Sequence, residues 1–215
     1  MPTNLFLIRH GEAHSNVEAV IAGERGDRGL TERGVAQARA LAQRLAAGEI
    51  AADVLYASTL PRARMTAEHV ARALGLPIEW DDDLQELRPG EADGMRIEDA
   101  RAAYPGFQRF LIEPFTPIAP GGESWGSFQA RTSAALERLI QRHQGETIVA
   151  VAHGGTIEMS FLYLLGLGPQ ARMRHAFHVR NTALTHWRHV EAFGGRQEWQ
   201  LVAHNDHWHL LEAKL

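Results

Sequence analysis

The sequence predicts an α/β fold, a three-layer αβα sandwich around an open, mostly parallel sheet. Short, continuous apolar runs alternate with longer segments whose apolar residues recur every three or four positions. Such runs are typical of strands buried on both faces, and the longer segments are typical of the helices that cover those faces. No internal repeat or low-complexity tract breaks the alternation. We therefore expect one domain over residues 1–215.

The predicted strands and helices follow one another along the chain. Apolar runs predict strands at 5–8, 53–57 and 147–152, with shorter or weaker ones at 78–80, 183–189 and 199–203. Apolar residues at helical spacing predict helices at 31–48, 61–75, 128–139 and 156–165. Pro61 suits a first helical turn, because an N–H group at that position has no partner within the helix.

The regular pattern loosens between Leu87 and Gly122, where prolines and glycines recur. These residues interrupt regular structure and leave room only for short helices, at 97–104 and 107–112. We interpret 87–122 as an irregular, cap-like insertion over one end of the sheet. Three aromatic residues in or beside it are candidates for lining a cleft: Phe110, Phe115 and Trp125.

Composition excludes several kinds of chemistry. The chain has no cysteine, which removes disulfides, a thiolate nucleophile and cysteine-ligated zinc. Its only lysine is Lys214, so a phosphate-loop NTPase and a Schiff-base enzyme both lack the lysine that they need. The formal charge of −4 argues against a nucleic-acid partner.

The sequence gives no sign of a membrane segment. No apolar run approaches the roughly 20 residues that span a bilayer. The residues after Met1 lead directly into an apolar run, without a basic leader or a small-residue cleavage site. We therefore expect a cytoplasmic protein with no membrane partner. The oligomeric state stays open.

Polar residues gather where the predicted strands end. Arg9 and His10 follow the first strand, Arg62 lies shortly after the second, and His153 follows the strand at 147–152. Glu86 closes the segment after the short third strand. In open α/β sheets, ligands bind outside the carboxyl ends of the strands. The sequence therefore predicts a crevice lined by two arginines, two histidines and one glutamate, a balance that favours an anion.

The predicted anion is a phosphate group. Arginine presents a planar fork that matches phosphate oxygens, and Arg62 falls in a first helical turn, where free N–H groups also favour negative charge. Gly154 and Gly155 open another helix and allow close approach of the backbone to an oxyanion. Each residue alone has a simpler interpretation, such as a His-Gly turn or an exposed carboxylate. Their joint position at one end of the sheet favours a phosphate site over separate, unrelated explanations for each residue.

Several motifs then resemble one known family. The first runs from Leu7 to Glu12, as Leu-Ile-Arg-His-Gly-Glu, with Asn16 shortly after it. Others follow in order, at 30–34 with 37–38, at 58–63 with 66–67, at 84–86 with Gly90 and Gly94, at 121–124 with Arg131, and at 151–155, with a weaker echo at Asn181. This ordered series resembles the histidine phosphatase superfamily, the phosphoglycerate mutase-like proteins.

The resemblance implies a mechanism and a set of site residues. His10 attacks phosphorus and becomes a phosphohistidine, Glu86 protonates the leaving oxygen, and water then releases the phosphate. The resemblance assigns binding of the phosphoryl group to Arg9, Arg62, His153, Asn16 and Gly154. The resemblance implies no metal and no cofactor, and it implies that the substrate is a small phosphorylated metabolite. We therefore expect a metal-independent phosphatase.

Elementary electrostatics is consistent with these roles. Neighbouring arginines disfavour an imidazolium, so we expect His10 to stay neutral and nucleophilic. Fixed cations stabilise the charge on the transferring phosphoryl group, which is magnesium's role in other phosphotransfer enzymes. Glu86 must start protonated to act as an acid, although the arginines stabilise its carboxylate. We expect it to become competent mainly when a phosphate dianion is bound.

The chain departs from the family pattern at two places, and one further residue near Glu86 is a candidate for the site. Ala13 stands where a threonine or serine is usual, which removes a hydroxyl near the nucleophile. The segment from Gly90 to Gly94 lacks the tryptophan that the family often has, so an aromatic wall is expected to be missing. Arg88 lies two residues from Glu86 and is a candidate for binding a second anionic group, or else a solvated surface residue.

Three other functions compete with a phosphatase. A phosphoglycerate mutase uses the same chemistry but returns the phosphoryl group to a bound product, and the stretch from Val17 to Arg28 does not match the mutases. A phosphate-sensing domain without activity would usually lack the nucleophile or the acid. A metallohydrolase conflicts with arginines placed against a cation. Apart from these functions, three histidines crowd the C-terminus and are conceivable metal ligands, although no carboxylate partner stands in register with them: His204, His207 and His209.

Overall fold

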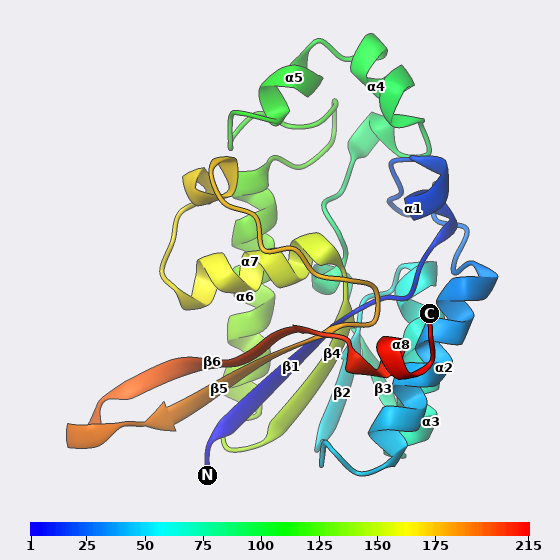
Figure 1. Cartoon of the computed structure of the whole chain (residues 1–215). Coiled ribbons are helices and arrows are strands. Elements are labelled where there is room, and N and C mark those ends of the chain that lie inside the picture. The colour runs from blue at the N-terminus through cyan, green and yellow to red at the C-terminus, as the bar shows by residue number, and fades with distance from the viewer.

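The computed structural model describes all 215 residues as a six-stranded sheet with helices on both faces (Figure 1). The order across the sheet is β3-β2-β4-β1-β5-β6. In chain order the strands are β1 (Thr3–Arg9), β2 (Val54–Ala57), β3 (Ile78–Trp80), β4 (Thr147–Ala152), β5 (Leu184–Glu191) and β6 (Gln197–Asp206). The expected α/β sandwich is confirmed, and so are all six expected strands.

Five strands share one direction, and only β5 runs against them. β1, β4, β2 and β3 pair in parallel, whereas β5 runs antiparallel to β1, and β6 antiparallel to β5. Since β1 and β2 both flank β4, the carboxyl ends of these three strands lie side by side at one edge of the sheet. β5 and β6 form a long hairpin that projects from the body of the molecule (Figure 1).

Eight α-helices accompany the sheet. They are α1 (His14–Glu18), α2 (Glu32–Ala46), α3 (Pro61–Leu74), α4 (Ile97–Ala103), α5 (Gly106–Phe110), α6 (Trp125–Arg142), α7 (Gly154–Leu164) and α8 (Trp208–Glu212). The expected helices are confirmed within a few residues of their ends. α1 and α8 were not expected, because five residues are too few to show a helical period. None of the helices is both long and apolar enough to cross a membrane.

The helices bury apolar stripes against opposite faces of the sheet. Leu41 of α2 and Val70 of α3 pack on β-strand residues such as Val149. On the other face, Leu136 of α6 and Phe161 of α7 share a core cluster with β1 and β4. Both faces of the central strands are therefore covered, which is why their sequences are continuously apolar.

The segment at 87–122 lies beyond the carboxyl edge of the sheet, where α4 and α5 form the top of the molecule in Figure 1. It has an apolar cluster of its own, in which Phe107, Phe110 and Ile118 pack with Phe128 of α6 and Met159 of α7. The expected insertion thus rests on the helices of one face and extends over the end of the sheet.

Two glycines bring the chain after β1 into direct contact with the start of α2. A Cβ atom on Gly34 would overlap the carbonyl oxygen of Glu12, and one on Gly11 would overlap the carbonyl oxygen of Gly34. Thr31 caps α2 by accepting a hydrogen bond from the Gly34 N–H at 3.0 Å. The loop that carries His10 is therefore fixed by backbone contact, for which only glycine leaves room.

This contact predicts a loss of stability for Gly34→Ala. The added methyl group must displace backbone, which lowers the free energy of unfolding by about 1–3 kcal/mol. Urea denaturation followed by circular dichroism measures the change. Gly106→Ala is the matched control, because a Cβ there meets its nearest atom only at 3.9 Å. Equal stability of the two variants would contradict the close packing of this loop.

Candidate active site

The site begins with three residues that directly follow three adjacent strands. His10 follows β1, Ser58 follows β2, and the register of β1 with β4 brings His153 beside His10. The His10 and His153 ring centroids are 5.2 Å apart. The two histidines therefore lie close together because they follow parallel, neighbouring strands, as the sequence predicted.

His10 is held in one tautomer. Its Nδ1 lies 2.6 Å from the carbonyl oxygen of Gly11, which can only accept a hydrogen bond. Its Nε2 lies 3.2 Å from Nε of Arg62, which can only donate one. Nδ1 therefore carries the proton, and the lone pair of Nε2 points to the guanidinium. The side chain is almost fully buried, since only 3% of His10 is exposed.

Burial keeps His10 neutral. Loss of water around the ring is the first cause that brings the pKa of His10 well below its ordinary value of 6.5, and the charges of Arg62 and Arg9 lower it further. The neutral imidazole agrees with the expectation from sequence. The arginines act in the expected direction, and desolvation, which the sequence did not indicate, is the larger cause.

His153 is also buried and neutral. Desolvation, followed by the charge of Arg62, lowers the pKa of His153 well below 6.5. Its Nε2 lies 2.7 Å from Oγ of Ser58, and its Nδ1 is buried without a hydrogen-bond partner in the protein. Ser58 Oγ also lies 3.4 Å from the N–H of Leu60, so that N–H donates to Oγ while the hydroxyl proton is free to point at His153. If the hydroxyl donates to His153 Nε2, then Nδ1 carries the ring proton, and no protein group accepts it.

Arg62 lies in the first turn of α3, as expected, and is anchored by a residue that the sequence did not single out. Its Nη1 donates to Oδ2 of Asp27 at 2.8 Å and to the carbonyl oxygen of Ala22 at 3.1 Å. The exposed fractions are 5% for the Arg62 side chain and 0% for the Asp27 side chain, so this ion pair is shielded from water.

Arg9 approaches the same place from the end of β1. Its Nη1 donates to the carbonyl oxygen of Val179 at 2.6 Å, and its Nε is buried without a partner. Desolvation lowers the pKa of Arg9, while the charge of Glu86 opposes that shift. A Cβ at Gly154 would lie 3.6 Å from Arg9 Nε, in ordinary van der Waals contact, so the guanidinium packs directly against this glycine.

Glu86 is placed at the start of α7. Its Oε2 accepts a hydrogen bond from the N–H of Gly155 at 3.0 Å, and its Oε1 accepts one from the N–H of Leu87 at 3.0 Å. A Cβ on Gly155 would overlap the carboxylate. The N–H of Gly155 therefore binds an anion, as its position in the sequence suggested, but that anion is the carboxylate of Glu86.

A buried ion pair shapes the segment that carries Glu86. Arg131 of α6 binds both carboxylate oxygens of Glu123 at 2.7 Å. The same guanidinium donates to the carbonyl oxygens of Asp83, Gln85 and Glu86 at 2.8, 3.0 and 3.2 Å. The motif at 121–124 with Arg131 thus fixes the backbone that presents Glu86.

Asn16 supports the backbone around the nucleophile. Its Oδ1 accepts a hydrogen bond from the N–H of Ala13 at 3.0 Å and lies 3.5 Å from Nδ2 of Asn181. Asn181 in turn donates to the carbonyl oxygen of His10 at 3.0 Å. The structure therefore brings Asn16 within two hydrogen bonds of His10, and its phosphate contact stays a prediction.

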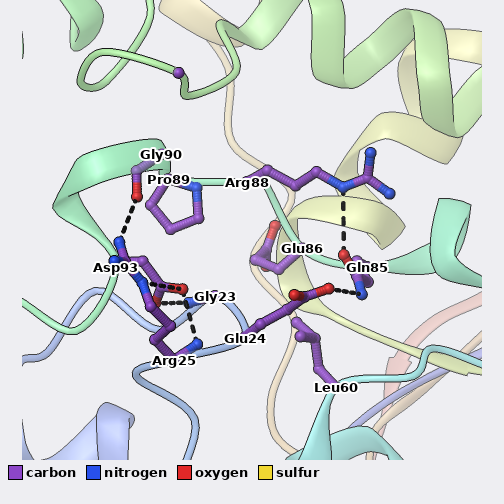
Figure 2. Close-up of a pocket in the computed structure, with 11 residues that line it drawn as sticks. Gly23, Glu24, Arg25, Leu60, Gln85, Glu86, Arg88, Pro89, Gly90 and Asp93 are labelled. Carbon is purple, nitrogen blue, oxygen red and sulfur yellow. Dashed lines mark hydrogen bonds and ion pairs between the residues drawn. The ribbon is translucent and has the colours of Figure 1, made fainter.

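Two cavities flank Glu86. One, of about 300 Å³, is polar and is lined by Glu24, Arg25, Arg88 and Asp93 among others (Figure 2). Figure 2 shows Arg88 turned toward Gln85, to whose side chain it donates a hydrogen bond of 3.3 Å. Its guanidinium also donates to the carbonyl oxygen of Asp82, and 46% of the side chain is exposed, so binding of a second anionic group by Arg88 stays a prediction.

The second cavity, of about 270 Å³, has an aromatic wall. Phe110 and Trp125 line it and stack with ring centroids 5.1 Å apart. Arg172 lies 4.4 Å above the Trp125 ring and 2.7 Å from a carboxylate oxygen of Glu158. Two of the three expected aromatic residues thus line the cavity. Phe115 does not, and its exposed fraction is 67%.

The histidines near the C-terminus serve other contacts. His204 lies 3.0 Å from the hydroxyl of Thr185, and His209 lies 3.0 Å from the hydroxyl of Thr182. His207 lies 2.6 Å from the carbonyl oxygen of Asn205. No three or more histidine, aspartate or glutamate side chains anywhere in the chain form a group that could hold a metal ion.

Comparisons with known proteins agree with this geometry. Residues 5–207 match the histidine phosphatase superfamily (branch 1). The chain is 36% identical over 177 residues to a 2,3-bisphosphoglycerate-dependent phosphoglycerate mutase of Brucella anthropi, covering 79% of this chain and 85% of that protein. The chain therefore belongs to the histidine phosphatase superfamily.

Solved structures show the same fold. YhfR of Bacillus stearothermophilus has a TM-score of 0.81 and 31% identity, with 97% of this chain and 99% of that chain covered. A phosphoserine phosphatase of Entamoeba histolytica, solved with 3-phosphoglyceric acid, has a TM-score of 0.80 and 29% identity, with 97% of this chain and 99% of that chain covered. Phosphatases and a mutase are thus both among the similar proteins, and phosphoryl transfer is the chemistry that they share.

The buried histidines predict that acid destabilises the protein. Unfolded His10 and His153 take up protons below about pH 6.5, whereas the folded side chains stay neutral. Since the unfolded state then binds more protons, the free energy of unfolding decreases as the pH is lowered. The decrease is up to about 1.4 kcal/mol per pH unit for each histidine. Denaturation of wild type and His10→Gln between pH 7 and pH 5 should give a smaller slope for the variant.

His14→Gln controls for the loss of a histidine at an exposed position, since 41% of that side chain is accessible. Equal slopes for wild type and His10→Gln would mean that His10 is not held neutral by the fold.

Proposed function

We propose that this protein is a metal-independent phosphatase that hydrolyses a small phosphomonoester through a phosphohistidine on His10. One observation carries the proposal: His10 is a neutral imidazole whose Nε2 lone pair points to the guanidinium of Arg62, beside Arg9 and His153. Arg62 Nε lies 3.2 Å from that nitrogen. Arg9 Nε and His153 Nδ1 are buried nitrogen atoms without partners in the protein. Phosphoryl oxygens would accept a hydrogen bond from Arg9 Nε, and from His153 in the tautomer that carries its proton on Nδ1, and so remove the penalty of unpaired burial.

The proposed reaction has two steps. His10 Nε2 attacks phosphorus, and the bond between phosphorus and the alcohol oxygen breaks while Glu86 gives that oxygen a proton. Water then attacks the phosphohistidine, the bond between phosphorus and nitrogen breaks, and the Glu86 carboxylate takes the proton from water. Inorganic phosphate leaves, and His10 and Glu86 return to their starting forms. Arg9, Arg62 and His153 hold the equatorial oxygens and stabilise their charge in both steps.

The charges around Glu86 favour hydrolysis over transfer to a second anionic molecule. A mutase must hold a carboxylate-bearing product while the phosphohistidine persists. In the polar cavity, Arg25 and Arg88 are outnumbered by Glu24, Glu86 and Asp93. Both arginines also donate to backbone carbonyl oxygens. The excess of carboxylates in that cavity therefore disfavours a second anionic group.

The second cavity supports the same proposal. Its single arginine, Arg172, is paired with Glu158, and Glu86 adds another carboxylate. The stacked rings of Phe110 and Trp125 instead offer apolar surface beside Glu86. An alcohol with an apolar part fits this lining better than a second phosphate or carboxylate does.

Mutase activity is the second candidate, and its support comes from sequence. The curated relatives that match this chain at 36% identity are named phosphoglycerate mutases. A non-catalytic phosphate sensor is a weaker candidate, because His10 and Glu86 are both present and oriented. Activity assays with 3-phosphoglycerate and 2,3-bisphosphoglycerate, read out as isomerised product and as free phosphate, separate the mutase from the phosphatase.

Acid-labile labelling tests the phosphohistidine. Wild-type protein mixed with a radiolabelled phosphate ester and quenched in alkali should retain label that is released by acid, and His10→Ala should retain none. A screen of phosphorylated metabolites, with and without chelator, should show turnover that the chelator leaves unchanged. Turnover by His10→Ala at the wild-type rate would exclude His10 as the nucleophile, and loss of wild-type turnover in chelator would exclude metal independence.

The role of Glu86 is tested by the leaving group. Glu86→Gln cannot donate the proton, so turnover of an alkyl phosphate should fall by about 10²-fold or more. Turnover of p-nitrophenyl phosphate, whose leaving group needs little protonation, should fall much less. Glu91→Gln, which changes an exposed carboxylate of the same segment, should match wild type on both substrates. Equal losses on the two esters would remove Glu86 from the role of acid.

A further inference from the structure

We infer that Asp27 is the positioning residue of this site: it fixes Arg62 so that one edge of the guanidinium faces both His10 and the incoming phosphoryl group. The inference deepens the proposed function and rests on it for its effect on turnover. Its geometric part concerns only Asp27, Arg62 and His10, and is tested independently of activity.

The contacts of Asp27 leave its carboxylate fully engaged. Oδ2 accepts hydrogen bonds from Arg62 Nη1 at 2.8 Å and from the Arg62 backbone N–H at 3.2 Å. Oδ1 accepts one from the N–H of Gly29 at 2.8 Å. The side chain is 0% exposed. A carboxylate that is buried this deeply persists only when it is paired and hydrogen-bonded, so Asp27 and Arg62 depend on each other.

This pairing decides which part of Arg62 is free. Nη1 is occupied by Asp27 and the Ala22 carbonyl oxygen, and Nε donates to His10 Nε2. Nη2 has no hydrogen-bond partner in the protein. The edge formed by Nε and Nη2 is one of the planar forks with which arginine binds two oxygens of a phosphate. Asp27 holds the opposite corner and thereby directs this edge toward the nucleophile.

The same geometry implies a change of partner when a substrate binds. The lone pair of His10 Nε2 is occupied by Arg62 Nε–H, 3.2 Å away, and must be released before the nitrogen can attack phosphorus. A phosphoryl oxygen can take over that N–H group. Because Nη1 stays bound to Asp27, a small rotation of the guanidinium is enough, and the arginine does not have to leave the site.

A second aspartate provides a matched control. Asp93 holds the preceding part of the same loop by accepting hydrogen bonds from the N–H groups of Gly23 and Arg25, both at 2.8 Å (Figure 2). It also accepts one from the N–H of Gly26 at 3.0 Å. It makes no contact with Arg62. Loss of Asp93 therefore disturbs the loop without removing the anchor of Arg62, and loss of Asp27 removes that anchor.

The experiment compares Asp27→Asn, Asp27→Glu and Asp93→Asn with wild type. Nitrogen-15 NMR of the His10 ring reports the hydrogen bond at Nε2. The Nε2 resonance should move toward that of a free lone pair in both Asp27 variants and should stay in place in Asp93→Asn. Asp27→Glu keeps the negative charge and lengthens the side chain, so it tests the position of Arg62 even where Asp27→Asn does not fold.

Turnover supplies the second measurement. A displaced catalytic group lowers kcat by up to about 10²-fold. We expect kcat of p-nitrophenyl phosphate to fall at least tenfold in Asp27→Asn. Its KM should rise as well, because Arg62 also holds the phosphoryl oxygens. Asp93→Asn leaves the anchor of Arg62 in place, so its loss of kcat should be smaller than that of Asp27→Asn.

The outcomes separate this inference from the proposed function. An unchanged His10 Nε2 resonance in both Asp27 variants, or the same KM and kcat changes in Asp27→Asn and Asp93→Asn, overturns the inference. A wild-type protein that hydrolyses no phosphate ester refutes the proposed phosphatase, while the NMR comparison still decides whether Asp27 positions Arg62.

Discussion

The hydrogen bond between Arg62 Nε and His10 Nε2, 3.2 Å long, is the interaction on which the site depends. It forms only if His10 is neutral, since an imidazolium has no lone pair to accept it. Burial of His10 maintains that state, and the carbonyl oxygen of Gly11 fixes the proton on the other ring nitrogen. Nucleophile and cation are thus oriented by each other before a phosphoryl group arrives.

The surrounding structure keeps this arrangement rigid by backbone contact and buried ion pairs. Gly11 and Gly34 bring the loop after β1 against α2, where no side chain fits. The ion pair of Arg131 with Glu123 holds the backbone that carries Glu86. In the ion pairs Arg62–Asp27 and Arg131–Glu123, the two charges compensate each other within the protein. A site built this way needs little reorganisation when charge develops.

Much of the fold and of the site is predictable from sequence because both depend on short-range signals. The apolar run before Arg9 marks a strand covered on both faces, and whatever follows it must lie at the carboxyl edge of the sheet. The same argument places His153. Asp27 gives no such signal, because it lies in an irregular loop and acquires its partner, Arg62, only when the chain folds back. The short helices α1 and α8 escape prediction for lack of a period.

The sequence by itself determined the alternation of strands and helices, the family, and the residue types that meet at the carboxyl edge, because apolar periodicity and strand ends are local properties. Only the tertiary structure decided how those residues are used. In the folded chain, the N–H of Gly155 donates to Glu86, and Arg88 donates to Gln85. Arg9 Nε and His153 Nδ1 have no partner in the protein. Hydrogen bonds between groups distant in sequence depend on distances of a few tenths of an ångström, which no pattern along the chain encodes.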